Sequence, residues 1–319
     1  MLARLGLFLL AGFVVLVRGE EAGPAPVAAV AAPAERPVQS PLELQVELHR
    51  RGFSCGSIDG VAGGQTAAAL RAFQRSAGIA DTGILDSPTQ ELLHLTAPAL
   101  GAYTFTAEDL AGLHPVPESW LEKSQLPALG YATALELAAE RFHAHPNLLR
   151  QLNPGVDWTA IAAGRGIVVP AVDRVVVTGT AAQIVITLGT RELEVVDALG
   201  RVIAHFPVSI ARMVEKRPVG TLHVVVTVAN PDYTFDPELF PESAEGRELG
   251  RRLRIPPGPN NPVGVAWIGL DLPGYGIHGT PEPEKIGRTE SHGCFRLANW
   301  DVLTLVGLVS VGMPVLVEP

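Results

Sequence analysis

The sequence is poor in cysteine, in net positive charge and in long apolar runs. It has 2 Cys in 319 residues, too few for a disulfide framework. Its 24 Lys and Arg are outnumbered by 33 Asp and Glu, and the formal net charge is -9. Binding of nucleic acid needs a basic surface, so we expect no nucleic-acid partner. Together these features exclude a coiled coil, a collagen, a polytopic membrane protein and a cystine-rich miniprotein.

The N-terminal segment is typical of a secretory signal peptide. One positive side chain, Arg4, precedes an uncharged, mostly apolar run over 5–17, and Arg18 ends that run. Such a run forms a helix of roughly 20 Å, short of the ~30 Å hydrocarbon core of a bilayer. We therefore expect residues 1–19 to direct export to the periplasm or cell wall, with transient membrane contact before cleavage, whereas an uncleaved anchor is the alternative. Residues 20–40, rich in Ala and Pro, are expected to form a flexible linker.

Residues 41–95 are expected to form a compact module of three helices. The first helix ends at Gly52, because glycine tolerates the left-handed conformation that follows many helices. The second is predicted to start at a Thr66 cap and to stop at Gly78. Pro88 favours the first turn of a third helix. Nothing in this module indicates catalysis, and a generic helical spacer is the alternative to a binding module.

Two further segments separate this module from the C-terminal part. Residues 96–130 contain Trp120 and several prolines, and we expect an ordered connector without regular structure. In 131–172 the spacing of apolar residues predicts two short helices, followed by a strand over 167–169. This second segment is expected to be a small α/β unit, or alternatively a helical hairpin that buttresses the next domain.

The C-terminal domain, residues 173–319, alternates short runs of branched apolar residues with turns. The chain has 33 Gly and 27 Pro, which favours many short strands over long helices. We predict a mostly β domain, an antiparallel sandwich or barrel, with one short helix over 300–309. The expected strands are 175–177, 184–188, 193–196, 202–208, 222–228 and 315–317.

One stretch near the C-terminus holds one cysteine and two histidines. A cysteine nucleophile must lose its proton, and an ordinary thiol at neutral pH needs a neighbouring base to do so. His292 is separated from Cys294 only by Gly293 and cannot easily fold back onto it. His278 ends a predicted strand, and a tertiary contact can bring it to Cys294, so we predict His278 as the general base and later the general acid. No carboxylate is suitably placed to orient the imidazole, so we expect a backbone carbonyl near Gly279 to do so.

The backbone around the cysteine has a second predicted use. Gly293 lets the chain curl, so that the amides of Gly293 and Cys294 can point at one oxygen, as an oxyanion hole requires. Arg296 shares the face of Cys294 if the segment is a strand. There it can hold a substrate carboxylate or pair with a nearby Asp or Glu, and the residues alone leave both roles open.

Two structural alternatives compete with a nucleophile at Cys294. Zinc held by His278, His292 and Cys294 lacks a close-spaced pair of ligands and an evident fourth ligand, so no metal is expected. A disulfide between Cys55 and Cys294 would join separate modules and would block the thiol. We therefore predict a free, reactive Cys294 and a structural Cys55.

The C-terminal motif resembles that of the L,D-transpeptidases with the YkuD catalytic domain. Two upstream segments, KRPVGTLHV and GPNNPVGVAWIGL, also resemble parts of that family, and the resemblance covers roughly residues 173–317. The motif itself consists of His278-Gly279 and Ser291-His292-Gly293-Cys294-Phe295-Arg296-Leu297-Ala298-Asn299.

This resemblance implies a role for each matching residue. Cys294 is implied as the nucleophile and His278 as the base. The oxyanion site and its surroundings are implied to include His292, Gly293, Ser291 and Gly279. Substrate contact is implied for Arg296 and Asn299.

Both N-terminal segments also resemble wall-binding modules. Gln45–Asp86 is similar to the small three-helix peptidoglycan-binding module found beside cell-wall enzymes. Residues 137–170 resemble a LysM-type glycan-binding module, although the usual Gly-Asp-Thr opening is missing. These resemblances imply peptidoglycan as the partner, through its glycan and its stem peptides.

The resemblance implies a cell-wall enzyme that works without a cofactor. Such an enzyme attacks stem tetrapeptides, releases D-Ala, forms a cysteine thioester and makes 3-3 cross-links, with consequences for wall biogenesis and cell shape. Water as the acceptor implies L,D-carboxypeptidase activity, and a protein lysine implies attachment of a protein to the wall. A non-catalytic peptidoglycan-binding protein is the remaining alternative.

Overall fold

The computed structural model describes residues 35–172, 175–239, 243–288 and 293–319. The predicted signal peptide, 1–19, and the linker up to residue 34 lie outside these residues. Contacts group residues 33–319 into one compact unit. In the part of the chain that the structure describes, no helix is both long and apolar enough to cross a membrane.

The N-terminal module contains the three helices predicted from the sequence. Helix α1 spans Pro41–Arg50, α2 spans Gly64–Ser76 and α3 spans Ser87–Leu92. The glycines after α1 and α2, Gly52 and Gly78, have φ of 84° and 71°, as expected for helix ends. A short antiparallel pair, β1 (Arg36–Pro37) with β2 (His94–Leu95), joins the two ends of the module.

The predicted cap of the second helix is wrong. Helix α2 begins after Gly63, and Thr66 lies inside its first turn. The Thr66 side chain is buried and accepts a hydrogen bond from Gln45 Nε2 at 3.1 Å. Thr66 therefore serves the contact between α1 and α2 and does not cap α2. The local sequence pattern does not reveal this contact.

The segment between the module and the C-terminal domain contains more regular structure than predicted. Strand β3 (Leu100–Thr104) lies in the expected irregular connector and pairs with β4 (Gly166–Pro170). Helices α6 (Ala134–Arg141) and α7 (Pro146–Leu152) confirm the two predicted helices. The connector also forms α4 (Ala107–Ala111) and α5 (Trp120–Gln125). The pairing of β3 with β4 joins residues more than sixty positions apart, which helical spacing cannot predict.

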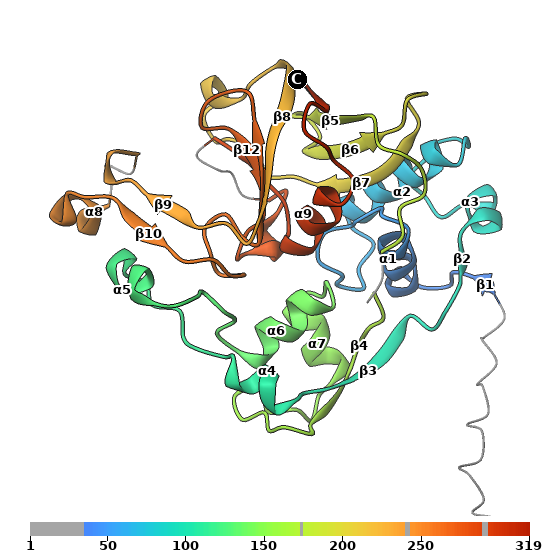
Figure 1. Cartoon of the computed structure of the whole chain (residues 1–319). Coiled ribbons are helices and arrows are strands. Elements are labelled where there is room, and N and C mark those ends of the chain that lie inside the picture. The colour runs from blue at the N-terminus through green and yellow to red at the C-terminus, as the bar shows by residue number, and fades with distance from the viewer. Residues whose placement is uncertain (1–34, 173–174, 240–242, 289–292) are drawn as a thin grey trace, which may run out of the picture. The chain divides into compact units, whose positions relative to one another are not determined.

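The C-terminal domain is mostly β, as predicted. Its described residues form an eight-stranded sheet in the order β13-β12-β11-β8-β14-β5-β6-β7 (Figure 1). These strands are β5 (Gln183–Thr187), β6 (Glu192–Val196), β7 (Val202–Pro207), β8 (Gly220–Ala229), β11 (Ala266–Leu270), β12 (Gly276–His278), β13 (Phe295–Arg296) and β14 (Pro314–Glu318). Helix α9 (Asn299–Val306) is the expected short helix.

Two features of this sheet differ from the prediction. The sheet is mixed, because β12 pairs with β13 and β14 pairs with β5 in parallel, whereas only antiparallel pairs were expected. Residues 175–177 form no strand. Instead the Val176 amide donates to the Arg50 carbonyl at 2.7 Å, so this segment follows the helical module.

The helical module packs directly on the far edge of the sheet. Helix α2 lies beside the edge strand β7 (Figure 1). The amide of His205 on β7 donates to the Gly52 carbonyl at 3.0 Å, and the Ser54 amide donates to the His205 carbonyl at 2.8 Å. One apolar core therefore includes Phe73 of the module and Val202 of the sheet.

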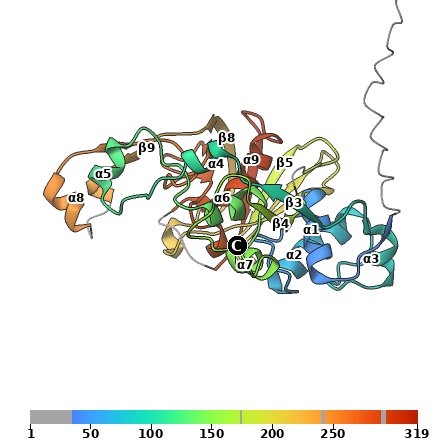
Figure 2. The same cartoon turned by 90° about the horizontal axis from the view of Figure 1, so that it is seen from below.

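A second group of elements projects from the β domain. Strands β9 (Tyr233–Phe235) and β10 (Leu253–Ile255) form a two-stranded sheet that carries α8 (Ala244–Leu249). Helix α5 of the connector packs on this arm, as Figures 1 and 2 both show. The described part of the domain also contains three short 3-10 turns: η1 (Val214–Lys216), η2 (Pro237–Leu239) and η3 (Pro283–Lys285).

Candidate active site

The parallel pairing of the edge strand β13 with β12 brings the segment of the predicted nucleophile beside the strand that carries the predicted base. His278 of β12 is in register with Arg296 of β13. Cys294 lies two residues before Arg296 and therefore has the same side-chain direction in an extended chain. The backbone of Gly276, two residues before His278, forms a hydrogen bond with the Cys294 thiol. The Cys294 thiol is thus hydrogen-bonded to the strand that ends at His278, although 16 positions separate the two residues.

The imidazole of His278 is held by its own backbone neighbour. Its Nδ1 lies 2.7 Å from the carbonyl oxygen of Gly279. A carbonyl only accepts hydrogen bonds, so Nδ1 carries the proton and Nε2 is the basic nitrogen. Burial lowers the pKa of His278 to about 4, although the hydrogen bond to Gly279 opposes this shift. The ring is therefore neutral at pH 7 and able to accept a proton through Nε2.

The Cys294 side chain is a partly exposed free thiol. Its Sγ donates to the carbonyl oxygen of Gly274 at 3.4 Å. Burial raises the pKa of Cys294, while the hydrogen bond with the Gly276 backbone acts in the opposite direction. A raised thiol pKa beside a neutral imidazole means that the resting site is an uncharged pair. Proton transfer must then accompany attack, as in general-base catalysis.

Trp267 lies beside His278 and was not among the site residues predicted from the sequence. Trp267 of β11 is opposite His278, and the two rings stack with centroids 5.6 Å apart and an interplanar angle of 18°. A Cβ on Gly276 would lie 2.4 Å from the indole ring. Gly269, opposite Gly276, would place its Cβ 3.0 Å from the indole Nε1. Because both glycines lack a side chain, they leave room for the indole ring. The alternation of Trp267 with Gly269 and of Gly276 with His278 was the feature of the sequence from which this contact could have been predicted.

Asn299, predicted to contact substrate, instead holds the backbone behind His278. It is 1% exposed at the start of α9. Its Oδ1 accepts from the amides of Val265 at 3.2 Å and Thr280 at 3.1 Å. Its Nδ2 donates to Glu140 Oε1 at 2.9 Å and to the Pro259 carbonyl at 3.1 Å. Both polar atoms of the side chain are thus used within the protein.

The remaining predicted site residues differ in what the structure describes. Ser291 and His292 lie outside the described residues. A Cβ added at Gly293 would meet none of the described atoms within 4 Å. Arg296 exchanges backbone hydrogen bonds of 2.9 Å with Ser209, and burial lowers the pKa of its guanidinium while nearby Glu282 opposes the shift.

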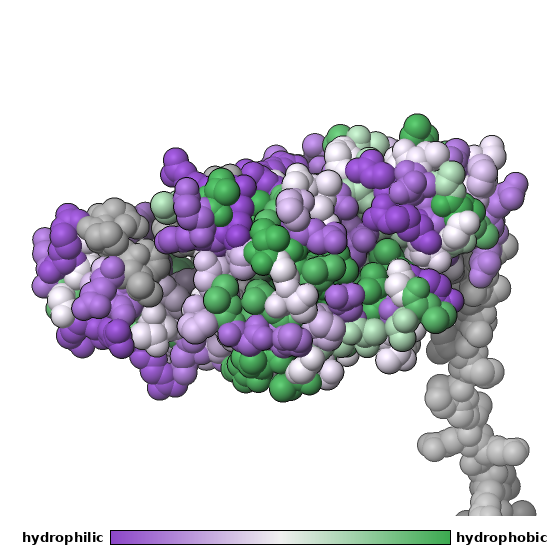
Figure 3. All heavy atoms as spheres, turned by 90° about the horizontal axis from the view of Figure 1, so that it is seen from above, coloured by the Kyte–Doolittle hydropathy of each residue, from purple (hydrophilic) through white to green (hydrophobic). Residues whose placement is uncertain are grey.

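The β9–β10 arm reaches the surroundings of the cysteine. Burial raises the pKa of Tyr233 on β9 to about 12, and the nearby Cys294 contributes to the shift. The arm is fixed to the connector by Trp120, whose ring stacks on Phe235 with centroids 4.4 Å apart. Glu245 of α8 accepts from the Trp120 amide at 2.9 Å, at the start of α5. The outer end of this arm presents a mainly hydrophilic surface (Figure 3).

Of the two alternatives for Cys294, the structure tests only the disulfide, because the zinc set includes His292, which lies outside the described residues. Cys55 is a buried free thiol, and no disulfide joins it to Cys294. Within the described ranges, no group of three or more His, Cys, Asp or Glu residues is arranged to hold a metal ion. Cys55 instead packs in the apolar core of the helical module.

The fold and site define a β-sheet protein with a cysteine and a histidine on one edge, joined to a helical module. Comparison with known proteins shows to which family this protein belongs. Residues 181–317 match the L,D-transpeptidase catalytic domain (YkuD), and residues 39–93 match a peptidoglycan-binding domain. The protein named L,D-transpeptidase YqjB of Bacillus subtilis is 31% identical over 140 residues, which cover 42% of this chain and 69% of that protein. The chain belongs to the L,D-transpeptidase family.

Two other similarities concern relatives of different length. The protein named L,D-transpeptidase YkuD of Bacillus licheniformis is 28% identical over 185 residues, covering 58% of this chain and 93% of that protein. A solved structure of the Enterococcus faecium L,D-transpeptidase C442S mutant has 19% sequence identity and a TM-score of 0.32. That similarity covers 46% of this chain and 52% of the other, so the chain matches about half of the solved protein.

Proposed function

We propose that this protein is a peptidoglycan L,D-transpeptidase that works through a thioester on Cys294. The observation that carries the proposal is the pairing of β12 with β13, together with the hydrogen bond between the Cys294 thiol and the backbone of Gly276, two residues before His278. Family membership supports the reaction class, and the free thiol beside a neutral imidazole supports cysteine chemistry. The donor is a stem tetrapeptide with a terminal D-Ala.

The first half of the reaction forms the thioester. His278 Nε2 takes the thiol proton as Sγ attacks the carbonyl carbon between the third residue and D-Ala. The negative charge on the carbonyl oxygen is stabilised by the amides of Gly293 and Cys294. As the C–N bond breaks, protonated His278 gives its proton to the nitrogen of D-Ala, which leaves. The Gly279 carbonyl keeps the imidazole in the tautomer that this cycle needs.

The second half transfers the acyl group to an amine on a neighbouring stem. His278 takes a proton from the attacking amine, a new amide bond forms, and the C–S bond breaks. The imidazole then returns its proton to Sγ, and the product is a 3-3 cross-link. Water in place of the amine gives L,D-carboxypeptidase activity, and a protein lysine gives attachment to the wall.

We assign Asn299 and Trp267 to support of this site. The buried Asn299 amide fixes the two backbone segments on either side of Gly279, and Trp267 fixes the ring plane of His278. Arg296 remains the proposed contact for a substrate carboxylate, and Ser291 and His292 remain proposed to complete the oxyanion site. Asn299 and Trp267 thus act through the position of His278, whereas Arg296, Ser291 and His292 act on the substrate.

The N-terminal modules are proposed to hold the enzyme on peptidoglycan. The match of residues 39–93 to a peptidoglycan-binding domain supports this role. The α6–α7 pair with β3–β4 supports a LysM-like unit at 131–172, completed by a strand from the connector. A substrate of this kind places the protein in the periplasm or outside the cell.

Mass spectrometry of muropeptides tests the proposal. Purified protein is incubated with disaccharide-tetrapeptides, and the products are compared with those of Cys294→Ala and Cys55→Ala. We expect D-Ala release and 3-3 dimers with the unmodified chain and with Cys55→Ala, and neither with Cys294→Ala. Equal products from the Cys294→Ala variant, or no products from any folded sample, would show a non-catalytic wall-binding protein instead.

A further inference from the structure

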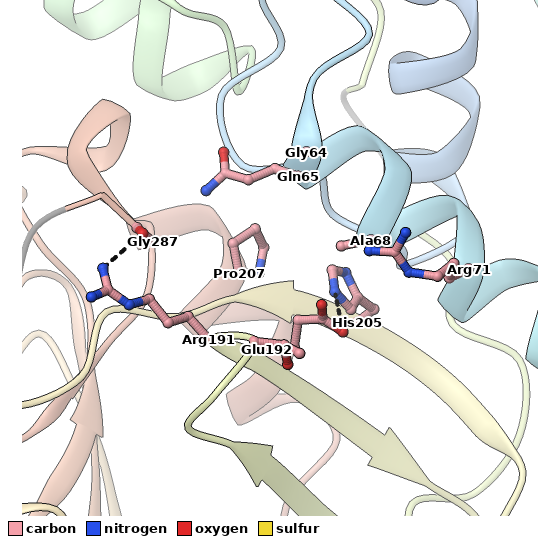
Figure 4. Close-up of a pocket in the computed structure, with 10 residues that line it drawn as sticks. Gly64, Gln65, Ala68, Arg71, Arg191, Glu192, His205, Pro207 and Gly287 are labelled. Carbon is pink, nitrogen blue, oxygen red and sulfur yellow. Dashed lines mark hydrogen bonds and ion pairs between the residues drawn. The ribbon is translucent and has the colours of Figure 1, made fainter. Parts of the chain in front are cut away.

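A pocket of about 340 Å³ lies between the helical module and the β domain. Figure 4 shows its walls: α2 on one side, the β6 and β7 strands below, and the loop after η3 opposite. This pocket lies outside the cysteine site, since neither Cys294 nor His278 lines it. Its lining includes Gln65, Arg71, Arg191, Glu192, His205 and Gly287.

The floor of the pocket carries two hydrogen-bond acceptors. His205 is 1% exposed, and its Nδ1 lies 3.0 Å from the Ser54 carbonyl, so Nδ1 carries the proton and Nε2 is an acceptor. Among the described residues Nε2 has no hydrogen-bond partner. The second acceptor is the carboxylate of Glu192, whose Oε2 lies 3.8 Å from His205 Nε2, beyond hydrogen-bond range. A buried acceptor without a donor is costly, so a ligand that brings a donor is favoured here.

The walls of the pocket carry positive charge. Arg71 of α2 lies near Glu192 and His205, and its charge acts on both groups. Arg191, in the turn before β6, donates through Nη1 to the Gly287 carbonyl at 3.1 Å. The N-terminus of α2 also lines the pocket, and its cap Gly63 gives no side-chain hydrogen bond to the first-turn amides. Helix N-termini and arginines together favour a carboxylate.

We propose that this pocket binds a zwitterionic amino-acid end, in which one carbon bears both an ammonium and a carboxylate. The ammonium donates to Glu192 and to His205 Nε2, and the carboxylate meets Arg71, Arg191 and the start of α2. On the proposed function, on which this inference rests, the matching group is the free end of the diamino acid in a peptidoglycan stem. The pocket is then a stem-peptide site that is separate from the cysteine.

The walls of this pocket connect it to the catalytic segment. Gln65 of α2 donates to the Ile286 carbonyl at 2.8 Å, and the Gly287 amide donates to Ser209 Oγ at 3.0 Å. Ser209 in turn pairs with Arg296 of β13. Ser209 thus links one wall of the pocket to the strand that directly follows Cys294.

Calorimetry with a synthetic stem tripeptide ending in diaminopimelate tests the proposal. The titration uses the full chain with Cys294→Ala, which cannot turn over, so its result does not depend on the transpeptidase assay. We expect Glu192→Gln and Arg71→Gln each to raise Kd at least fivefold. Arg201→Gln is the control, because Arg201 is an exposed arginine of the β domain that pairs with Asp197 and does not line the pocket. It is expected to stay within twofold.

Modified tripeptides separate this pocket from the cysteine site. Acetylation of the free amine should weaken binding to the unmodified pocket at least fivefold and should leave binding to Glu192→Gln nearly unchanged. Amidation of the neighbouring carboxylate should likewise weaken binding to the unmodified pocket at least fivefold, and it should leave binding to Arg71→Gln nearly unchanged. Equal discrimination by parent and variant would overturn the assignment, and the modified peptides report even if a variant fails to fold. Free D-alanine that binds as tightly as the tripeptide would also overturn it, in favour of a free amino acid.

Discussion

Asn299 Nδ2 donates to Glu140 Oε1 at 2.9 Å and so joins the catalytic domain to helix α6. The two residues are 159 positions apart, and both are buried. The same Asn299 accepts the Thr280 amide directly after Gly279, whose carbonyl orients His278. The α6 segment is therefore part of the support of the proposed base and does more than carry a binding module.

The first prediction concerns this link. Burial raises the pKa of Glu140 to about 7, although the hydrogen bond from Asn299 opposes the shift. Glu140→Ala removes a buried acceptor and should lower the free energy of unfolding by about 1–3 kcal/mol, and transpeptidation about tenfold. Glu140→Gln keeps an acceptor of the same length and should retain most activity. Urea unfolding and the muropeptide assay measure both, and equal activity of the Ala variant would contradict the link.

A second prediction concerns the close approach of three segments at Gly279. A Cβ there would lie 2.1 Å from Asn299 Oδ1. Gly279→Ala should therefore displace Asn299 and the carbonyl that holds His278, and lower activity by roughly a hundredfold. Gly155→Ala is the control, because no described atom lies within 4 Å of its added Cβ. Initial rates of D-Ala release, with circular dichroism of both variants, check the result, and similar rates for the two would refute the argument.

The third prediction concerns the protonation state of Cys294. Burial disfavours the thiolate and raises the pKa of Cys294, so the thiol is protonated at neutral pH. The thiolate is the reactive form, so the rate of alkylation by iodoacetamide should increase about tenfold for each unit by which pH rises, until pH reaches that pKa. Cys55, which is buried and whose pKa is also raised by burial, should stay unlabelled in the folded chain. Peptide mapping after timed quenching gives both rates, and a rate independent of pH would indicate a preformed ion pair.

A fourth prediction links pH to stability through Asp301. This carboxyl is buried on α9, accepts from Ser54 Oγ at 3.0 Å, and has its pKa raised by burial to about 8. The folded chain keeps this proton up to about pH 8, whereas the unfolded chain releases it near pH 4. Its contribution to stability is therefore lost as pH rises between these values.

Asp301→Asn should remove this loss. The variant should gain about 1–3 kcal/mol relative to the parent between pH 5 and pH 8.5, the usual cost of an uncompensated buried polar group. Asp271→Asn is the surface control: hydrogen bonds to His223 lower the pKa of Asp271, so it cannot produce the same trend. Guanidinium unfolding at both pH values measures the difference, and parallel pH dependence of parent and Asp301→Asn would count against the prediction.

Local patterns in the sequence predicted most strands and helices of the β domain and the module. Strands β5, β6, β7, β8 and β14 lie within a few residues of their predicted ranges, because alternation of side chains and turn residues act over short distances. The failures came from long-range contacts. Residues 175–177 do not pair with a strand, because the Val176 amide hydrogen-bonds to the helical module instead. Thr66 is buried against α1 and does not cap α2.

For the site, the sequence by itself determined the chemical groups: a cysteine, a histidine without a carboxylate partner, and glycines around both. It also predicted a backbone carbonyl near Gly279 as the group that orients the histidine, and the Gly279 carbonyl lies 2.7 Å from His278 Nδ1. Only the tertiary structure decided that β12 and β13 run parallel, that Trp267 covers Gly276, and that Asn299 turns inward toward Glu140. The physical reason is that side-chain identity is local, whereas strand register and burial depend on contacts between segments that are distant in the chain.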